Sequence, residues 1–130
     1  MIKINFVKVE NLQAMNNLLT AQLRAYKQLL WQPLVDIYED SKGWLVKIEL
    51  AGVCNEDIDI SVTGECLIIS GTRRDCAIQK GQKLYSMEIA YNKFQRVINI
   101  PCNCNIEKVN MDTEFKDGML LIRLKMRKGK

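Results

Sequence analysis

From residue 34 to residue 125 the sequence alternates between apolar and other side chains, and this pattern limits the possible folds more than any other feature. The clearest runs are residues 44–50, 58–62, 67–69, 94–100, 109–115 and 120–124. A strand points successive side chains to opposite faces, so each run has one apolar face to bury. Gly52, Gly64, Gly71 and Pro101 lie between the runs and are typical of turns. We therefore expect seven or eight short strands.

No pattern of a crossover helix lies between these runs. The pair Asp117-Gly118 is a hairpin signal between the last two of them. Strands that follow one another without crossover helices pair antiparallel, and two such sheets bury their apolar faces by stacking. We therefore predict a mostly β fold, an antiparallel β-sandwich.

Residues 11–31 have a different period, with apolar side chains at steps of three and four residues. The positions are Leu12, Met15, Leu19, Leu23, Tyr26 and Leu30. This spacing predicts an amphipathic helix with a broad apolar stripe, and Pro33 ends the pattern. Because the helix precedes the strand pattern, we expect it to be an N-terminal appendage to the sandwich.

Composition and charge argue against several classes of partner. The 130 residues suit one domain with a short appendage, and the net charge of +4 comes from interspersed signs. No basic stripe accompanies the aromatic residues, so we expect no nucleic-acid partner. No apolar run approaches the roughly 20 residues of a membrane span, and the first residues lack a signal-peptide pattern. We therefore expect a cytoplasmic protein with no membrane partner.

The sequence has no histidine, which removes the usual general base at neutral pH and the commonest nitrogen ligand of zinc. Its five cysteines are Cys54, Cys66, Cys76, Cys102 and Cys104. An odd number without a secretion signal predicts reduced thiols. The pair Cys102 and Cys104 raises the alternative of a metal or redox site, but no spacing supplies four ligands. We expect no metal and no cofactor, and Cys76, in a polar stretch, is the best candidate for an exposed reactive thiol.

Motifs spread over most of the chain occur in a fixed order. They are Trp31-x-Pro33-x-x-Asp36, Leu50-Ala51-Gly52-Val53, Leu67-x-Ile69-x-Gly71-x-Arg73, Glu88-x5-Phe94-x-Arg96, Ile100-Pro101 and Phe115-x-Asp117-Gly118-Met119-Leu120. Together they resemble the α-crystallin domain of small heat-shock proteins, in its bacterial and plant branch. The resemblance implies an immunoglobulin-like sandwich over residues 31–127, an N-terminal arm at 1–30 and a very short tail at 128–130.

The resemblance also implies two interaction surfaces. A groove for peptides or tails, between two edge strands, would be formed by Ile58, Ile60, Val62, Val109, Met111 and Thr113. A dimer interface made by strand exchange would use Val35, Ile37, Tyr38, Leu84, Tyr85 and Arg96. Arg96 alternates with Phe94 and Ile98 on the inward side, where a charge needs a partner. The alternative for Arg96 is an exposed position on an edge strand.

In the family, an Ile-x-Ile in the tail fills the groove of a neighbouring dimer, whereas here only MRKGK follows the last predicted strand. Ile2-Lys3-Ile4 and Val7-Lys8-Val9 repeat that spacing, so we expect one of them to fill the groove; alternatively, they pack on their own domain. Without a tail plug we expect dimers or small assemblies. Together with the helix stripe, Ile2 and Ile4 are also our candidates for client binding and assembly.

The function that the resemblance implies is that of an ATP-independent chaperone, a holdase, with no catalytic residue. Such a protein binds non-native clients by mass action and keeps them from aggregating. The sequence lacks the Gly-x4-Gly-Lys-[Ser/Thr] motif of nucleotide-binding loops. The main alternative is a structural or assembly protein that uses the same domain to bind one dedicated partner or coat. A co-chaperone that docks on an ATP-driven chaperone, and a metal or redox protein, are further alternatives.

Overall fold

The structure, a computed structural model, describes residues 2–6, 31–101 and 109–125. The helix predicted before Pro33 lies outside these residues, as do Cys102, Cys104 and the triplet Val7-Lys8-Val9. Among the residues described, no helix is long and apolar enough to span a membrane.

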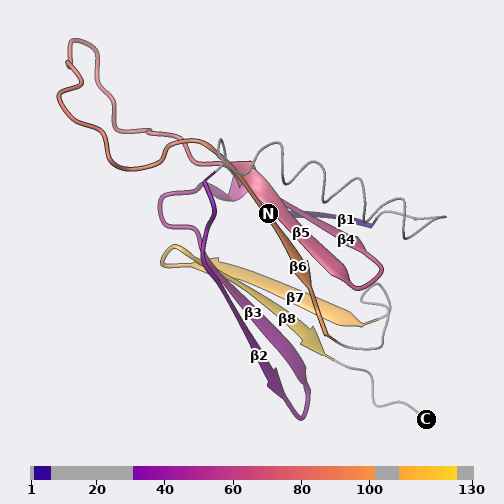
Figure 1. Cartoon of the computed structure of the whole chain (residues 1–130). Coiled ribbons are helices and arrows are strands. Elements are labelled where there is room, and N and C mark those ends of the chain that lie inside the picture. The colour runs from indigo at the N-terminus through magenta and orange to yellow at the C-terminus, as the bar shows by residue number, and fades with distance from the viewer. Residues whose placement is uncertain (1, 7–30, 102–108, 126–130) are drawn as a thin grey trace.

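The described residues form a sandwich of two four-stranded sheets (Figure 1). One sheet has the order β1 (Lys3–Phe6), β4 (Ile58–Thr63), β5 (Cys66–Thr72) and β6 (Lys93–Asn99). The other has the order β2 (Val35–Asp40), β3 (Gly43–Glu49), β8 (Met119–Lys125) and β7 (Asn110–Lys116). A short 3-10 turn, η1 (Asn55–Asp57), leads into β4. The predicted β-sandwich is therefore confirmed.

Every pair of neighbouring strands is antiparallel except β1 and β4, which run parallel. The alternation in the sequence selects the side chains that lie between the sheets. The buried core contains Val46, Ile48, Leu50, Val53, Ile58, Ile60, Val62, Leu67, Ile69, Phe94, Ile98, Ile100, Leu120, Ile122 and Leu124. Removing so much apolar surface from water is what holds a sandwich of this kind together.

Two positions, the β7–β8 hairpin and Gly71 within β5, show why glycine is needed where the sequence has it. Asp117 and Gly118 join β7 to β8 with φ angles of 54° and 78°, the left-handed backbone that a two-residue hairpin requires. At Gly71 the reason is space, because an added Cβ would overlap the carbonyl oxygen of Asp57 and lie 2.7 Å from Cζ of Phe94. Gly71 thus lets the end of η1 lie directly against β5.

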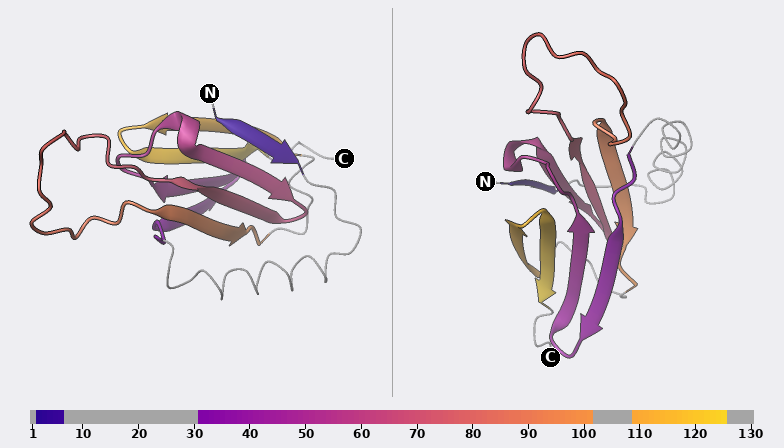
Figure 2. Two further views of the ribbon diagram at one scale, coloured as in Figure 1. Left: turned by 90° about the horizontal axis from the view of Figure 1, so that it is seen from above. Right: turned by 90° about the vertical axis from the view of Figure 1, so that its left-hand side faces the viewer.

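Residues 73–92 form a long connection between β5 and β6 that projects away from both sheets (Figures 1 and 2). The structure assigns no strand to this connection within the single chain. Its exposed large apolar side chains are Ile78, Leu84, Tyr85, Met87 and Ile89. We call residues 73–92 the projecting loop.

Candidate interaction surfaces

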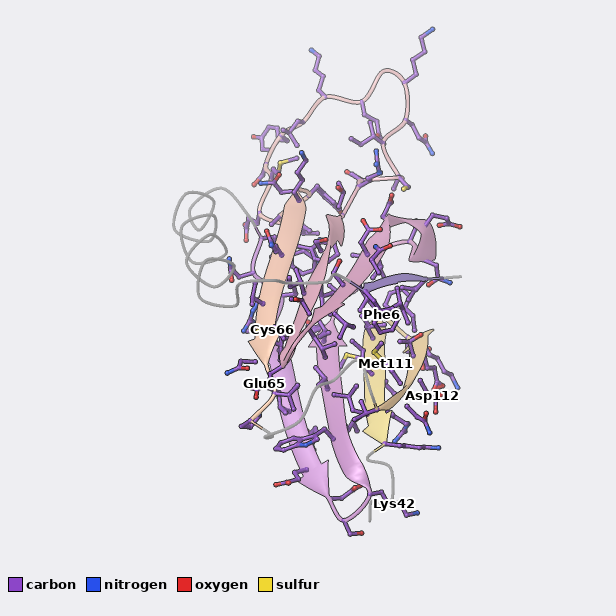
Figure 3. All side chains as sticks on the ribbon, turned by 90° about the vertical axis from the view of Figure 1, so that its right-hand side faces the viewer. Phe6, Lys42, Glu65, Cys66, Met111 and Asp112 are labelled. Atoms are coloured by element: carbon purple, nitrogen blue, oxygen red, sulfur yellow. The ribbon has the colours of Figure 1, made fainter. Side chains whose placement is uncertain are left out.

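The first candidate surface is the side of the sandwich where β1, paired with β4, and β7 are the border strands of their sheets. β1 pairs with β4 in parallel, so that Ile4 is opposite Ile60 and Phe6 is opposite Val62. Ile2 and Ile4 are half-buried and pack against the core together with Val109 and Met111. Figure 3 shows Phe6 of β1 and Met111 of β7 on this same side. We call this region the β4–β7 seam.

The six residues predicted to form the groove divide into two groups along this seam. Ile58, Ile60 and Val62 are fully buried in the core, whereas Val109, Met111 and Thr113 are half-buried. The seam therefore contains all six, and the first triplet of the chain covers it. Their role in binding peptides or tails stays a prediction.

The second candidate surface is the free edge of β2. This strand pairs with β3 on one side, and in the described part of the chain no strand pairs with its other side. Ile37 and Tyr38 are 43% and 48% exposed, and Leu34 just before the strand is 71% exposed. An edge with unpaired backbone groups and apolar side chains is a surface on which another strand can add.

The residues expected to meet that edge lie on the projecting loop. Leu84 is 72% exposed and Tyr85 is 101% exposed, so neither is held by the sandwich of its own chain. Val35 is half-buried and packs against the core. The structure describes one chain, so the predicted dimer interface stays a prediction. Of the side chains assigned to it, Ile37, Tyr38, Leu84 and Tyr85 are exposed.

Arg96 lies on β6 between Phe94 and Ile98 and is half-buried. Its Nη1 donates a hydrogen bond of 2.7 Å to the backbone carbonyl of Pro33. The partner that an inward arginine needs is therefore a carbonyl, not a carboxylate. This bond ties β6 to the segment that leads into β2, next to the free edge.

Sequence reasoning missed the anchor of the projecting loop, which is Arg73. Its guanidinium lies over the ring of Trp31, with Cζ 3.5 Å from the ring centre. Its Nε donates a hydrogen bond of 2.8 Å to the carbonyl of Ala90. Nη1 donates to the carbonyl of Ala51 at 3.3 Å. Arg73 thus joins both ends of the loop to the body of the sandwich. The spacing Gly71-x-Arg73 was visible in the sequence, but nothing there indicated which groups the arginine contacts.

Three of the cysteines lie among the described residues, and all three are free thiols. Cys54 and Cys76 are exposed, which agrees with the prediction for Cys76, and Cys66 is half-buried at the start of β5. Burial raises the pKa of Cys66, with a smaller contribution from the charge of Glu65. Within the described ranges, no cluster of three or more potential metal ligands occurs.

The predicted client-binding stripe falls almost wholly outside the described residues. Only Ile2 and Ile4 from that set can be placed, and both lie in the β4–β7 seam. The positions Leu12, Met15, Leu19, Leu23, Tyr26 and Leu30 are not described by the structure.

Comparison with known proteins identifies the family to which this sandwich is similar. The model of the Hsp20/alpha crystallin family matches residues 36–130. Small heat shock protein C2 of Rickettsia felis is 33% identical over 99 residues, covering 75% of this chain and 63% of the relative. The 17.7 kDa class II heat shock protein of Arabidopsis thaliana is 28% identical over 111 residues, covering 84% of this chain and 69% of the relative.

A solved structure gives the same result for the fold. Heat shock protein 16.0 from Schizosaccharomyces pombe superposes with a TM-score of 0.64 at 27% identity, covering 77% of this chain and 92% of that one. The two Rickettsia felis relatives are longer proteins, since the match covers 63% and 60% of their lengths.

Proposed function

We propose that this chain, which belongs to the Hsp20/alpha crystallin family, is an ATP-independent chaperone that binds non-native proteins and suppresses their aggregation. Residues 31–127 would be its α-crystallin domain and residues 1–30 its N-terminal arm. The observation that carries the proposal is that large apolar side chains are exposed on a sandwich whose core is otherwise well buried. Leu84 and Tyr85 on the projecting loop, and Ile37 and Tyr38 on β2, are all accessible to another chain.

Self-association would use these exposed groups. The loop of one subunit would extend along the free edge of β2 of its partner and add a strand there, because main-chain hydrogen bonds and alternating apolar side chains both favour such an addition. The anchoring of both loop ends by Arg73 supports this proposal, since it leaves the tip free while fixing its direction. A solved structure of the family from Xylella fastidiosa is described as having a distinct high order structure.

The β4–β7 seam would serve a different purpose from the dimer surface. Ile2 and Ile4 already lie in it, so we propose that the N-terminal triplet acts as the plug of this groove. A plug from the same chain would compete with apolar segments of neighbouring subunits and of clients. Replacement of both Ile2 and Ile4 by Ser would then change the size of the assembly, and an unchanged size would rule out this role.

Client binding needs no chemistry beyond apolar contact and mass action. A protein that binds the unfolded or partly folded form of a client lowers the free concentration from which aggregates grow. The exposed side chains include Leu84 and Met87, and flexible Met and Leu side chains adapt to many partners. We place the main client surface on the N-terminal arm together with these groups.

The experiment that tests the proposal is light scattering from a heat-unfolding client, with and without this protein and without nucleotide. Suppression at near-stoichiometric amounts, with a complex of client and chaperone that elutes together, is the expected result. A second sample that lacks residues 1–30 measures how much of the activity belongs to the arm. A folded protein that gives no suppression would overturn the general chaperone function and favour the alternative, an assembly protein with one dedicated partner.

A further inference from the structure

The outer face of the β1–β4–β5–β6 sheet carries a group of uncharged side chains in two neighbouring rows across β4, β5 and β6. The register aligns them as Ser61–Ile68–Val97 and Thr63–Cys66–Asn99. They point away from the core, because their neighbours along the strands, Val62, Leu67 and Ile98, are the side chains buried in it. We call these six residues the outer patch, and its middle row contains the apolar pair Ile68 and Val97.

The outer face of the other sheet has a different character. Two rows across β2, β3, β8 and β7 are Asp36–Lys47–Leu121–Glu114 and Tyr38–Leu45–Arg123–Asp112. Both rows contain charges of both signs, and Asp112 also pairs with Lys125 at 3.7 Å. Charged side chains are typical of a sheet face that water covers. The absence of charge from the outer patch therefore indicates a face that packs against an apolar partner.

The burial of the outer patch points the same way. Ile68 and Val97 are half-buried, and Thr63 is only 4% exposed although it faces outward. Cys66 is on the same face, since its Sγ contacts Oδ1 of Asn99 at 3.9 Å. The Oγ1 atom of Thr63 is buried and has no hydrogen-bond partner among the described residues. A buried hydroxyl normally has a partner, so a segment that docks here can supply one.

The two borders of this sheet are joined by residues 7–30. β1, at one border, ends at Phe6 beside Val62. Trp31 is held at the other border, because its N–H donates to the carbonyl of Lys93 at 3.0 Å and its ring packs edge-on against Phe94. β4 and β5 separate β1 from β6 (Figure 2). The core fills the inner side of the sheet, so the direct path between the two borders runs over the outer face.

The helix predicted for residues 11–31 matches this path in length. Phe6 and Trp31 lie at opposite borders and near opposite ends of the strands, a diagonal of about 20 Å. A helix of about 20 residues is about 30 Å long, so it can cross the whole patch. The apolar stripe of such a helix is stabilised by burial against an apolar surface. The stripe contains Leu12, Met15, Leu19, Leu23, Tyr26 and Leu30.

We propose that the amphipathic helix predicted for residues 11–31 docks on the outer patch of its own chain, with its apolar stripe against Ile68 and Val97. The occupant of this face is thus a segment of the same chain, one that lies outside the described residues. A client that binds the stripe would compete with the outer patch for it. The proposal goes beyond the proposed chaperone function and can be tested without a client.

The reactivity of Cys66, inside the outer patch, reports whether the patch is occupied. The full-length protein is treated with N-ethylmaleimide for a series of times and digested with trypsin. Cys54 and Cys66 fall in one peptide, since no Lys or Arg lies between residues 48 and 72, and fragment ions in the mass spectrometer distinguish the two labels. Amide hydrogen exchange of residues 11–30 is measured on the same proteins.

Variants on the helix leave the sandwich unchanged. Leu19→Gln combined with Leu23→Gln places two amides on the apolar stripe, and Gln keeps a good helix propensity. We expect the labelling of Cys66 and the exchange of residues 11–30 to become about tenfold faster, because the docked state then opens more often. The matched control, Asn17→Gln combined with Ala21→Gln, places the same side chains on the opposite side of the predicted helix and should change neither rate.

Variants on the sheet test the patch itself. Ile68→Thr combined with Val97→Thr keeps β-branched side chains, which suit strands, but removes the apolar pair. The exchange of residues 11–30 should again become about tenfold faster. Leu121→Thr, at a half-buried position on the outer face of the other sheet, is the control and should leave this exchange unchanged. Circular dichroism checks that each variant is folded.

The outcomes separate docking on the same chain from the other possibilities. Equal Cys66 labelling in the Leu19/Leu23 variant and in the Asn17/Ala21 variant would overturn the proposal. Protection of Cys66 that is lost when the protein is diluted would also overturn it, because the occupant would then be a second copy of the chain. Protection that is the same at every protein concentration, and that only the stripe variant removes, is the expected result.

Discussion

The β4–β7 seam and the free edge of β2 differ in whether another strand of the chain covers them. At the β4–β7 seam, the first strand of the chain pairs with β4 and brings Ile2 and Ile4 against the core. At the other side, the free edge of β2 has no covering strand among the described residues, and Ile37 and Tyr38 remain nearly half exposed. Among the described residues, one side is thus closed by the first strand of the chain, and the other is left accessible.

This difference bears on the proposed dimer surface. An uncovered edge strand invites association with other chains, and proteins usually cover it or place charges there. Here β1 covers β4, whereas Leu34, Ile37 and Tyr38 at the free edge of β2 are exposed. An open edge of this kind would suit the self-association proposed above.

The largest expected effect comes from a change inside the sandwich, away from both sides. Gly71→Ala would place a Cβ against the carbonyl of Asp57 and the ring of Phe94. We expect a loss of about 3 kcal/mol in the free energy of unfolding, because backbone and a buried ring must both move. Urea denaturation measures it.

The control for that prediction is Gly81→Ala in the projecting loop. No atom lies within 4 Å of its added Cβ, although its φ is 89°, so only the conformational effect of about 1 kcal/mol or less remains. Equal losses at both glycines would contradict the steric argument.

A second prediction concerns the open side alone. Tyr85→Ala should weaken self-association by about 2 kcal/mol, or about thirtyfold in the dimer Kd, because aromatic anchors dominate interfaces. The stability of the single chain should change by less than about 0.5 kcal/mol, since Tyr85 is fully exposed. Analytical ultracentrifugation measures the first value and urea denaturation the second.

Lys83→Ala, at another exposed position two residues away, is the matched control. If Tyr85→Ala and Lys83→Ala leave the Kd equally unchanged, the loop is not the dimer element.

A third prediction concerns the closed side. Ile4→Ser should lower the free energy of unfolding by about 1.5 kcal/mol, because a half-buried apolar side chain returns to water. Phe6→Ser at the end of the same strand, where the side chain is 59% exposed, should have an effect below about 0.5 kcal/mol. Thermal and urea unfolding are the measurements.

Protein concentration separates two versions of this result. A plug on its own chain gives a loss of stability that is the same at every protein concentration, whereas a plug on a neighbour gives a loss that shrinks on dilution, because the wild type then dissociates as well. If the loss of stability depends on protein concentration, the seam is filled by a neighbouring subunit and not by its own chain, and the two sides no longer differ in this way.

The smallest effect expected is a dependence on alkaline pH at Cys66, which belongs to neither side. Burial raises the pKa of this thiol above its ordinary value of 9.0. As the pH rises through that value, the unfolded chain loses the proton first, so the unfolded state is favoured and stability falls. Cys66→Ala should reduce this slope. Unfolding curves at a series of pH values measure it, and an unchanged slope would contradict the assignment.

Much of the sandwich could be predicted because its signals are local. The alternation of apolar residues in β4 and β8, for example, fixes which faces are buried, and Asp117-Gly118 fixes the hairpin that joins β7 to β8. The pairing of β1 with β4 was not predicted as a parallel pair. More than fifty residues separate these strands, and nothing local specifies the direction in which such distant segments meet.

For the candidate surfaces, the sequence predicted the side chains that are exposed but not the contacts that hold them in place. The chemical character of Leu84, Tyr85 and Ile37 is readable, and the structure leaves all three exposed. The partner of Arg96 was not readable, because it is a carbonyl of the backbone, which every residue has. The stack of Arg73 on Trp31 was missed for a similar reason, since the two residues lie on segments that only the fold brings together.

By itself, then, the sequence determined the class of fold, the strand positions and the family resemblance, because side-chain alternation and turn residues act over a few positions. Only the tertiary structure decided that β1 pairs with β4, that Arg73 holds the projecting loop and that Arg96 binds the carbonyl of Pro33. These are contacts between segments far apart in the chain. Their geometry follows from the packing of the two sheets as a whole and from the close approach that Gly71 permits.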